Sequence, residues 1–260
     1  MNYYQLDCWE SPTPAQVDQA KIVTAPLIAW QGYVPGWGNP YGGGWTAEGV
    51  AAVLGAGLGY LPLLVPSSLP GTNPDTWDVG IIFAEHHVAA GGGKLSAVGL
   101  NVEAGWSAAD PTGWRGSALA FAAAAARSGV AGYVYGSPSF LASLAGAGAP
   151  SGIYAGDWPN GASAPSPAAI SSLLAIPGIP DTEWVGPGQR IWQFQGGHQI
   201  QGIPFNCDLS LTDPSVPYCR QYVAPAPAPV PDPPPAPKPT QLSSGLWVYA
   251  SSQPFAITEG

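Results

Sequence analysis

The sequence predicts an α/β fold: a single (β/α)8 (TIM) barrel followed by a Pro/Ala-rich linker and a short C-terminal tail. Three observations lead to this prediction. Strand-like apolar segments alternate with helix-like segments up to residue 222, which is typical of parallel β/α architectures. Eight candidate strands can be counted, and a chain of 260 residues is long enough for one such barrel. The composition also changes sharply near Tyr222.

Each candidate strand is a short apolar run bounded by turn-forming or polar residues. In chain order, the strands are Gln5–Trp9, Pro26–Val34, Tyr60–Val65, Ala97–Ala104, Gly132–Gly136, Gly152–Asp157, Arg190–Gln195 and Phe205–Leu211.

The helix-like segments lie between these strands and carry recognisable start signals. One begins at Thr46 with Glu48 in its first turn. Others cover Trp77–Ala90, Trp114–Ser128, Ser137–Ala147 and Ser166–Ala175, the last two opening on a Ser–Pro pair that suits an N-cap followed by proline at the first helical position. The helix before the last two strands is poorly marked, which makes the eighth unit the least well defined.

The C-terminal part is expected to be extended rather than globular. Residues 223–240 are rich in Pro and Ala and predict a polyproline-type linker with a rise of about 3.1 Å per residue. Residues 241–260 hold a few apolar side chains, including Trp247 and Phe255, but form too short a tail to bury a core of their own. The tail is interpreted either as a docking peptide for a protein partner or the barrel, or as a disordered end.

The charge pattern argues against several classes of partner. Only 9% of residues are charged, the net charge is −9, and the 7 basic residues are scattered. Nucleic acids and anionic membrane surfaces are therefore not expected as partners, because both need clustered Lys and Arg. No apolar run is long enough for membrane insertion. The N-terminus shows no signal peptide, so an extracellular or virion-associated protein would leave the cell by lysis or in a phage particle.

The chain has three cysteines, Cys8, Cys207 and Cys219, without the CxxC spacing of zinc and redox motifs. We expect buried free thiols, with a Cys207–Cys219 or a Cys8–Cys219 disulfide as the alternative. No metal and no cofactor is expected.

Strands that end in an acid, an amide or an aromatic residue recur along the chain. Active sites of such barrels lie at the C-terminal ends of the strands, so these residues are the candidates for function. One acid alone is most often a helix cap, and one aromatic residue is most often packing, but their repetition on successive strands favours a shared site. The candidate catalytic residues are Asp7, Asn101, Glu103 and Asp208. The candidate substrate-binding residues are Trp30, Gln31, Tyr33, Trp106, Tyr135, Tyr154, Asp157, Trp192 and Gln193.

Strand geometry brings the acids together. Asn101 and Glu103 are two residues apart and therefore share a face, with Val102 turned outward. Asp7 and Asp208 lie on the strands that close the barrel and should be neighbours. Carboxyl groups close to other carboxylates and aromatic rings tend to have a raised pKa, and glycosidic cleavage requires a protonated acid near neutral pH.

The motifs occur in an informative order between Tyr4 and Asp213. They are LDCW with Asp7, Asn101-Val102-Glu103, YVYGSPSFLASL, GIYAGDWP, Trp192-Gln193-Phe194 and Cys207-Asp208-Leu209-Ser210. This order resembles the family-25 glycoside hydrolases, which are muramidases. It is still more similar to the related glycoside-hydrolase-like domain known as domain of unknown function 1906, found in actinobacteria and their phages. The resemblance implies binding or hydrolysis of bacterial cell-wall glycan, with Glu103 as general acid and Asp7 and Asp208 as supporting carboxylates.

Asn101 departs from the family pattern, because muramidases have Asp at this position. An amide cannot act as a base, although it can orient an N-acetyl group by hydrogen bonding. Three functions follow: a glycosidase acting on peptidoglycan or a related polysaccharide, a catalytically inactive carbohydrate-binding module, and a structural virion protein. Asn101 favours the second over a full muramidase, whereas the three acids favour the first over the third.

Overall fold

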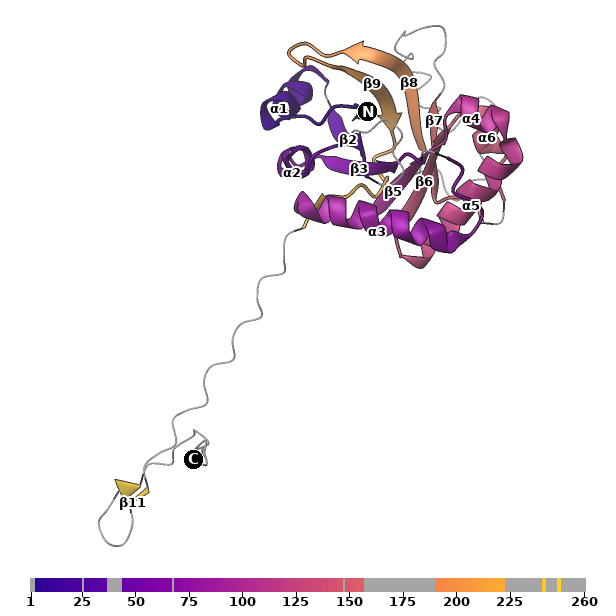
Figure 1. Cartoon of the computed structure of the whole chain (residues 1–260). Helices are drawn as coiled ribbons and strands as arrows, with labels where there is room; N and C mark the ends of the chain where they lie inside the picture. The colour runs from indigo at the N-terminus through magenta and orange to yellow at the C-terminus, as the bar shows by residue number, and fades with distance from the viewer. Residues whose placement is uncertain are drawn as a thin grey trace. The chain divides into compact units, whose positions relative to one another are not determined.

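The computed structural model describes residues 3–24, 26–36, 44–66, 68–146, 148–156, 190–222, 240–241 and 247–248. The chain divides into two units, Met1–Tyr222 and Val223–Gly260. The first unit is a closed barrel of eight strands with helices between them (Figure 1). The predicted (β/α)8 fold class is therefore confirmed.

The barrel strands follow one another in chain order around the sheet. They are β1 (Tyr4–Asp7), β2 (Leu27–Tyr33), β3 (Gly59–Leu64), β5 (Ala97–Asn101), β6 (Ala131–Gly136), β7 (Gly152–Gly156), β8 (Arg190–Gln199) and β9 (Asn206–Thr212). All neighbours from β1 to β8 pair in parallel.

The last strand differs from the predicted all-parallel arrangement. β9 runs antiparallel to both β8 and β1, and only a short turn joins β8 to β9, which explains why the sequence shows no helix signal before the last strand. The reversal leaves the start of β9 at the same end of the barrel as the ends of the parallel strands, because an antiparallel strand begins where its parallel neighbours finish.

Six helices are described in the barrel unit: α1 (Pro14–Val23), α2 (Ala47–Gly55), α3 (Pro74–Ala90), α4 (Ala104–Ala109), α5 (Pro111–Arg127) and α6 (Pro138–Ala142). Several begin with side-chain caps that the sequence encodes. Thr13 and Gln16 form a capping box at α1, and the Ser137 hydroxyl caps α6 with Pro138 at its first position. The predicted helix Ser166–Ala175 lies outside the described residues.

The described residues also include strands of only two residues. β4 (Gly93–Lys94) pairs with β10 (Arg220–Gln221), and β11 (Thr240–Gln241) pairs with β12 (Trp247–Val248) in the second unit. Thr240, which we assigned to the linker, therefore begins a strand. The rest of the predicted linker and tail lies outside the described residues, so their proposed roles stay predictions.

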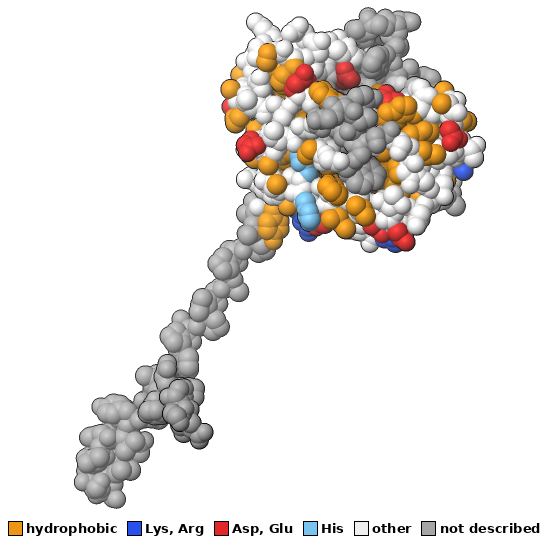
Figure 2. All heavy atoms as spheres, viewed as in Figure 1, with side chains coloured by type: hydrophobic (Ala, Val, Ile, Leu, Met, Phe, Trp, Pro, Cys, Tyr) orange, Lys and Arg blue, Asp and Glu red, His pale blue; other side chains and the backbone are white. Residues whose placement is uncertain are grey.

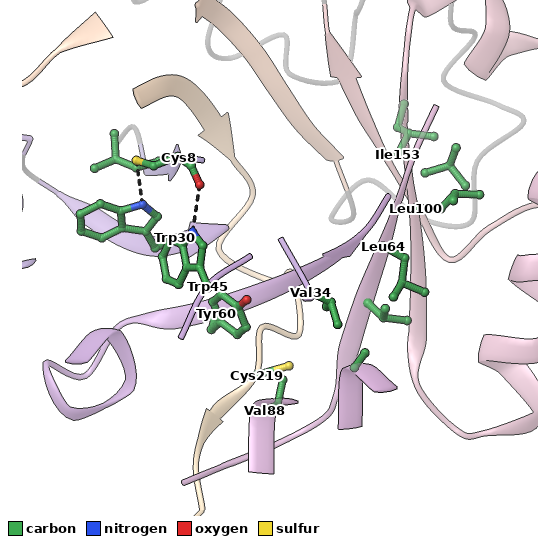
Figure 3. Packing of buried hydrophobic residues seen from close by; sticks show 14 of the residues in the cluster. Cys8, Trp30, Val34, Trp45, Tyr60, Leu64, Val88, Leu100, Ile153 and Cys219 are labelled. Atoms are coloured by element: carbon green, nitrogen blue, oxygen red, sulfur yellow. Dashed lines mark hydrogen bonds between the residues drawn. The ribbon is translucent and has the colours of Figure 1, made fainter. Parts of the chain in front are cut away.

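Two apolar clusters hold the barrel together. The inner cluster fills the barrel with side chains such as Leu61, Tyr133 and Tyr218. The outer cluster lies between the strands and the helices, where Trp30, Trp45 and Tyr60 pack together (Figure 3). Gly32 makes room for this packing, since a Cβ there would lie 2.2 Å from the Trp45 ring.

A disulfide joins Cys8 to Cys207, with a Cα–Cα distance of 4.5 Å, and Cys219 is a buried free thiol. Free thiols at Cys8 and Cys207 and both alternative disulfides were therefore wrong. The strand register explains the pairing: Asp7 lies opposite Asp208, so the next step along the antiparallel ladder places Cys8 opposite Cys207. The Trp30 indole donates to Cys8 Sγ and the Trp45 indole donates to the Cys8 carbonyl (Figure 3).

The surface is sparsely charged. On the face of the barrel shown in Figure 2, acidic and basic side chains are scattered among uncharged ones. In the described part of the chain, no helix is long and apolar enough to cross a membrane.

Candidate functional site

Four predicted catalytic residues lie around one mouth of the barrel. Asp7 ends β1, Asp208 is near the start of β9, Asn101 ends β5, and Glu103 immediately precedes α4. The two aspartates come from adjacent strands, where they are register partners. Asp7 and Asp208 are therefore neighbours, as the sequence predicts.

These residues line two pockets that share Tyr33, Asn101 and Glu103. The inner pocket has a volume of about 140 Å³ and is lined by Asp7, Tyr33, Leu63, Asn101, Glu103, Tyr135, Gln193 and Asp208. The outer pocket has a volume of about 440 Å³ and is lined by Trp9, Tyr33, Asn101 and Glu103. A polar inner pocket thus opens beside a larger pocket with an aromatic wall.

Asp7 is buried at the base of this site. Its Oδ2 accepts hydrogen bonds from Gln31 Nε2 at 2.9 Å and from the Tyr154 hydroxyl at 3.4 Å. Burial, followed by the neighbouring Asp208 charge, raises the pKa of Asp7 well above its usual value, and the hydroxyls of Tyr154 and Tyr33 only partly offset this rise. Asp7 therefore favours its neutral form more than an exposed aspartate does.

Both carboxyl oxygens of Asp208 accept a hydrogen bond. Gln193 Nε2 donates to Oδ2 at 2.8 Å, and the Gly197 backbone N–H donates to Oδ1 at 2.7 Å. Burial raises the pKa of Asp208, but these two hydrogen bonds lower it. The Tyr135 hydroxyl donates to Gln193 Oε1 at 2.7 Å, and the Nε2 end of the same amide faces Asp208.

Glu103 is half-buried and lines both pockets. Its Oε1 accepts a hydrogen bond of 2.8 Å from Asn101 Nδ2, so the amide that replaces the expected Asp orients the Glu103 carboxyl group. Among the described residues, the buried atoms Asn101 Oδ1 and Asp7 Oδ1 have no hydrogen-bond partner.

The tyrosines around the acids are neutral phenols. Burial and the nearby carboxylates raise the pKa of Tyr33, Tyr135 and Tyr154. Each can therefore donate a hydrogen bond at neutral pH. Tyr33 also packs against Trp9 with ring centroids 4.7 Å apart, and this pair forms the aromatic wall of the outer pocket.

Several predicted substrate-binding residues lie elsewhere. Trp30 and Trp192 are buried in the outer cluster on the helix side of the sheet and are not among the residues that line either pocket. Each is adjacent to an inward-facing glutamine, and neighbours on a strand point to opposite faces. Trp106 stacks on Trp114 of α5 and is not among the residues that line either pocket.

Gln31 and Tyr154 are buried beside Asp7 and donate hydrogen bonds to its Oδ2; they are not among the pocket-lining residues. Tyr33, Tyr135 and Gln193 do line the pockets. Asp157 lies outside the described residues.

Sequence reasoning missed Trp9 and Leu63. Trp9 follows Asp7 by two positions and shares its face, so the spacing rule that linked Asn101 to Glu103 would have found it. Leu63 is an ordinary apolar strand residue, and no sequence signal distinguishes it. In the described ranges, no group of three or more His, Cys, Asp or Glu side chains is arranged to hold a metal ion.

No protein-family model matches the sequence, and no curated protein matches it. Solved structures do match. One is the catalytic domain of endolysin Ply40 from bacteriophage P40 of Listeria monocytogenes, with a TM-score of 0.56 and 14% identity over 82% of this chain and 94% of that one. Another is a glycosyl hydrolase 25 of Streptococcus pneumoniae, the virulence factor GHIP, with a TM-score of 0.51 and 12% identity over 82% of this chain and 87% of that one.

A third match is the modular autolysin LytC from Streptococcus pneumoniae, with a TM-score of 0.52 and 12% identity over 81% of this chain and 46% of that one. At sequence identities this low, the structural matches show a common fold and no more. The chain thus shares its barrel fold with an endolysin catalytic domain, an autolysin and a family-25 glycosyl hydrolase.

Proposed function

We propose that the barrel binds and hydrolyses bacterial cell-wall glycan, either peptidoglycan or a related polysaccharide. The observation that carries this proposal is the grouping of Asp7, Glu103 and Asp208 around one small pocket. Glycosidic cleavage uses a pair of carboxyl groups, one of which protonates the leaving oxygen. The barrel fold shared with an endolysin and an autolysin supports a wall glycan as the substrate.

In this proposal Glu103 is the general acid. It is half-buried and borders both pockets, so its proton can reach a glycosidic oxygen between sugars bound on either side. Asp208 lies beside Asp7 in the inner pocket, where its carboxylate would stabilise the positive charge that develops on the sugar ring in the transition state. Asn101 orients Glu103 through its 2.8 Å hydrogen bond.

The outer pocket suits a sugar ring. Trp9 and Tyr33 offer flat apolar faces, while Asn101 and Glu103 offer polar atoms. A pocket with a mainly apolar wall and a few convergent polar groups is the usual form of a small-ligand site. The unpartnered oxygen of Asn101 would accept a hydrogen bond from a donor such as a sugar hydroxyl, because a buried polar atom without a partner costs about 1–3 kcal/mol.

The substrate implies that the protein works outside the cytoplasm, extracellularly or as a virion or tail component of a phage. The Cys8–Cys207 disulfide fits an oxidising environment. In the same proposal the C-terminal tail binds a protein partner.

A carbohydrate-binding module without catalysis is the second candidate, and Asn101 is the observation that favours it. An amide cannot accept a proton as a base, so a mechanism that needs a carboxylate at this position would fail. Sugar binding would remain, because neither the aromatic wall nor the hydrogen bonds of Asn101 depend on a charge there.

A wall-turbidity assay combined with a pull-down on the same walls separates the two functions. Wild type should clear the walls and Glu103→Gln should not, while both should bind, since general acid–base help is typically worth about 10²–10⁴-fold in rate. Glu85→Gln is a matched control, because Glu85 is exposed on α3. Equal clearing by wild type and Glu103→Gln would remove Glu103 from the mechanism. Binding without clearing by wild type would establish the binding module.

A further inference from the structure

Asp7 and Asp208 form a facing pair of acids at the seam where β1 meets β9. Asp7 is 5% exposed, and Asp208 is partly buried beside it. Two carboxylates that share a site with little water do not ionise together easily, and one of them holds its proton to a higher pH. The hydrogen bonds around the pair decide which one does so.

Asp208 is surrounded by donors. Gln193 Nε2 donates to one carboxyl oxygen and the Gly197 N–H donates to the other. The Gln193 amide cannot turn its oxygen toward Asp208 without losing the hydrogen bond from the Tyr135 hydroxyl. Because hydrogen bonds donated to both oxygens favour the ionised form, Asp208 is built to be the carboxylate.

Among the described residues, Gln31 and Tyr154 donate to Oδ2 of Asp7, while the buried Oδ1 has no partner. Gln31 Nε2 donates to Oδ2, and the Gln31 amide is oriented in turn by Gln5, whose Nε2 donates to Gln31 Oε1 at 3.2 Å. Gln5 is itself held by the Tyr218 hydroxyl, which donates to Gln5 Oε1 at 2.6 Å. All three supporting side chains are buried. This series of hydrogen bonds makes Oδ2 an acceptor, which favours the unpartnered Oδ1 as the place for a proton on Asp7.

We propose that the two glutamines divide the facing acids into one carboxylate and one carboxylic acid. Gln193 keeps Asp208 ionised, and Gln31 orients Asp7 so that Oδ1 carries a proton and can donate a hydrogen bond into the inner pocket. Both glutamines are positioning residues. The inference rests on the proposed function only for its catalytic use, as a donor toward a sugar oxygen.

The other groups around Asp7 agree with this division. Glu103 adds a second acidic neighbour at the mouth, and the phenols that face Asp7 from the remaining strands are neutral; they are Tyr33 on β2, Tyr154 on β7 and Tyr135 on β6. No Lys or Arg is among the described residues that line the inner pocket. Nothing in that lining therefore offers a positive charge to ionise both acids at once.

The test follows the carboxyl carbons of aspartate by NMR. The full chain is labelled with carbon-13 in the aspartate side chains and titrated without glycan, and the two signals are assigned through Asp7→Asn and Asp208→Asn. Asp208 should lose its proton at a lower pH than Asp7. Gln193→Leu should move the Asp208 midpoint upward by about one pH unit, since a hydrogen bond to a charged group has this effect.

Gln199→Leu is the matched control, because Gln199 is exposed on the same strand, β8; it should move neither midpoint. If Gln193→Leu does not fold, Tyr135→Phe replaces it, since it removes the hydrogen bond that the Tyr135 hydroxyl donates to Gln193 Oε1 and should shift the Asp208 midpoint in the same direction. Ionisation of Asp7 before Asp208 would overturn the proposal. So would an Asp208 midpoint that stays at the control value. Because no glycan is present, failure here is distinct from failure of wall hydrolysis.

Discussion

Removal of the Cys8–Cys207 disulfide should lower the free energy of unfolding substantially. The two cysteines are 199 positions apart in the sequence, so the cross-link closes almost the whole barrel into one loop. In the chain-entropy model, a loop of this length corresponds to about 5 kcal/mol at 25 °C. Loss of native disulfides in other proteins typically costs about 2–5 kcal/mol, and we expect a loss in this range.

The measurement is urea unfolding of wild type and of the double variant Cys8→Ala/Cys207→Ala, each with and without a thiol reductant. Cys219→Ala serves as the control, because Cys219 is a buried thiol outside the disulfide. Reductant should destabilise wild type and the control but not the double variant. If reductant leaves the wild-type midpoint unchanged, the reasoning about chain closure is refuted.

Three further predictions concern charge. Asn101→Asp places a carboxylate beside Glu103 in place of an amide 2.8 Å away, so one of the two must hold a proton, and wall clearing should become faster than in wild type; unchanged clearing would contradict this. Asp7→Asn should raise the melting temperature at pH 7 and abolish wall clearing. The pKa of Asp7 is raised in the folded protein, so ionisation of Asp7 destabilises the fold as pH rises above about 4. A lower melting temperature of the variant would count against this prediction. Burial lowers the pKa of His87 to about 4, so wild type should lose stability, by up to about 3 kcal/mol, as pH falls from about 6.5 to 4; His87→Gln should flatten this part of a pH series of urea melts.

The parts of the fold that local patterns encode could be predicted from the sequence. Apolar runs marked the barrel strands, and Ser137–Pro138 marked the start of α6. The direction of β9 could not be predicted, because an isolated strand has the same alternation in either direction. Its reversal depends on the turn after Gln199 and on pairing with β1, which is about 200 residues away in sequence.

The candidate site was predictable to the extent that strand periodicity was applied. The two-residue rule placed Asn101 and Glu103 at the mouth, but it was not applied to strand two, where Trp30 and Gln31 are neighbours and cannot both face inward. The glutamine contacts could not be foreseen, because Gln31 and Gln193 acquire their roles from partners on other strands.

Where β1 pairs with β9, the facing acids Asp7 and Asp208 lie next to the Cys8–Cys207 disulfide. Facing acids in a strand pair are destabilising, and Asp7 and Asp208 face each other at the last register position of this pairing. One step further along the same ladder, the disulfide joins Cys8 to Cys207. A cross-link at that position opposes the separation that the acids would otherwise favour, and it does so without supplying a positive charge that would ionise both of them. The protonated state of Asp7 can therefore persist at this seam while the strands remain paired.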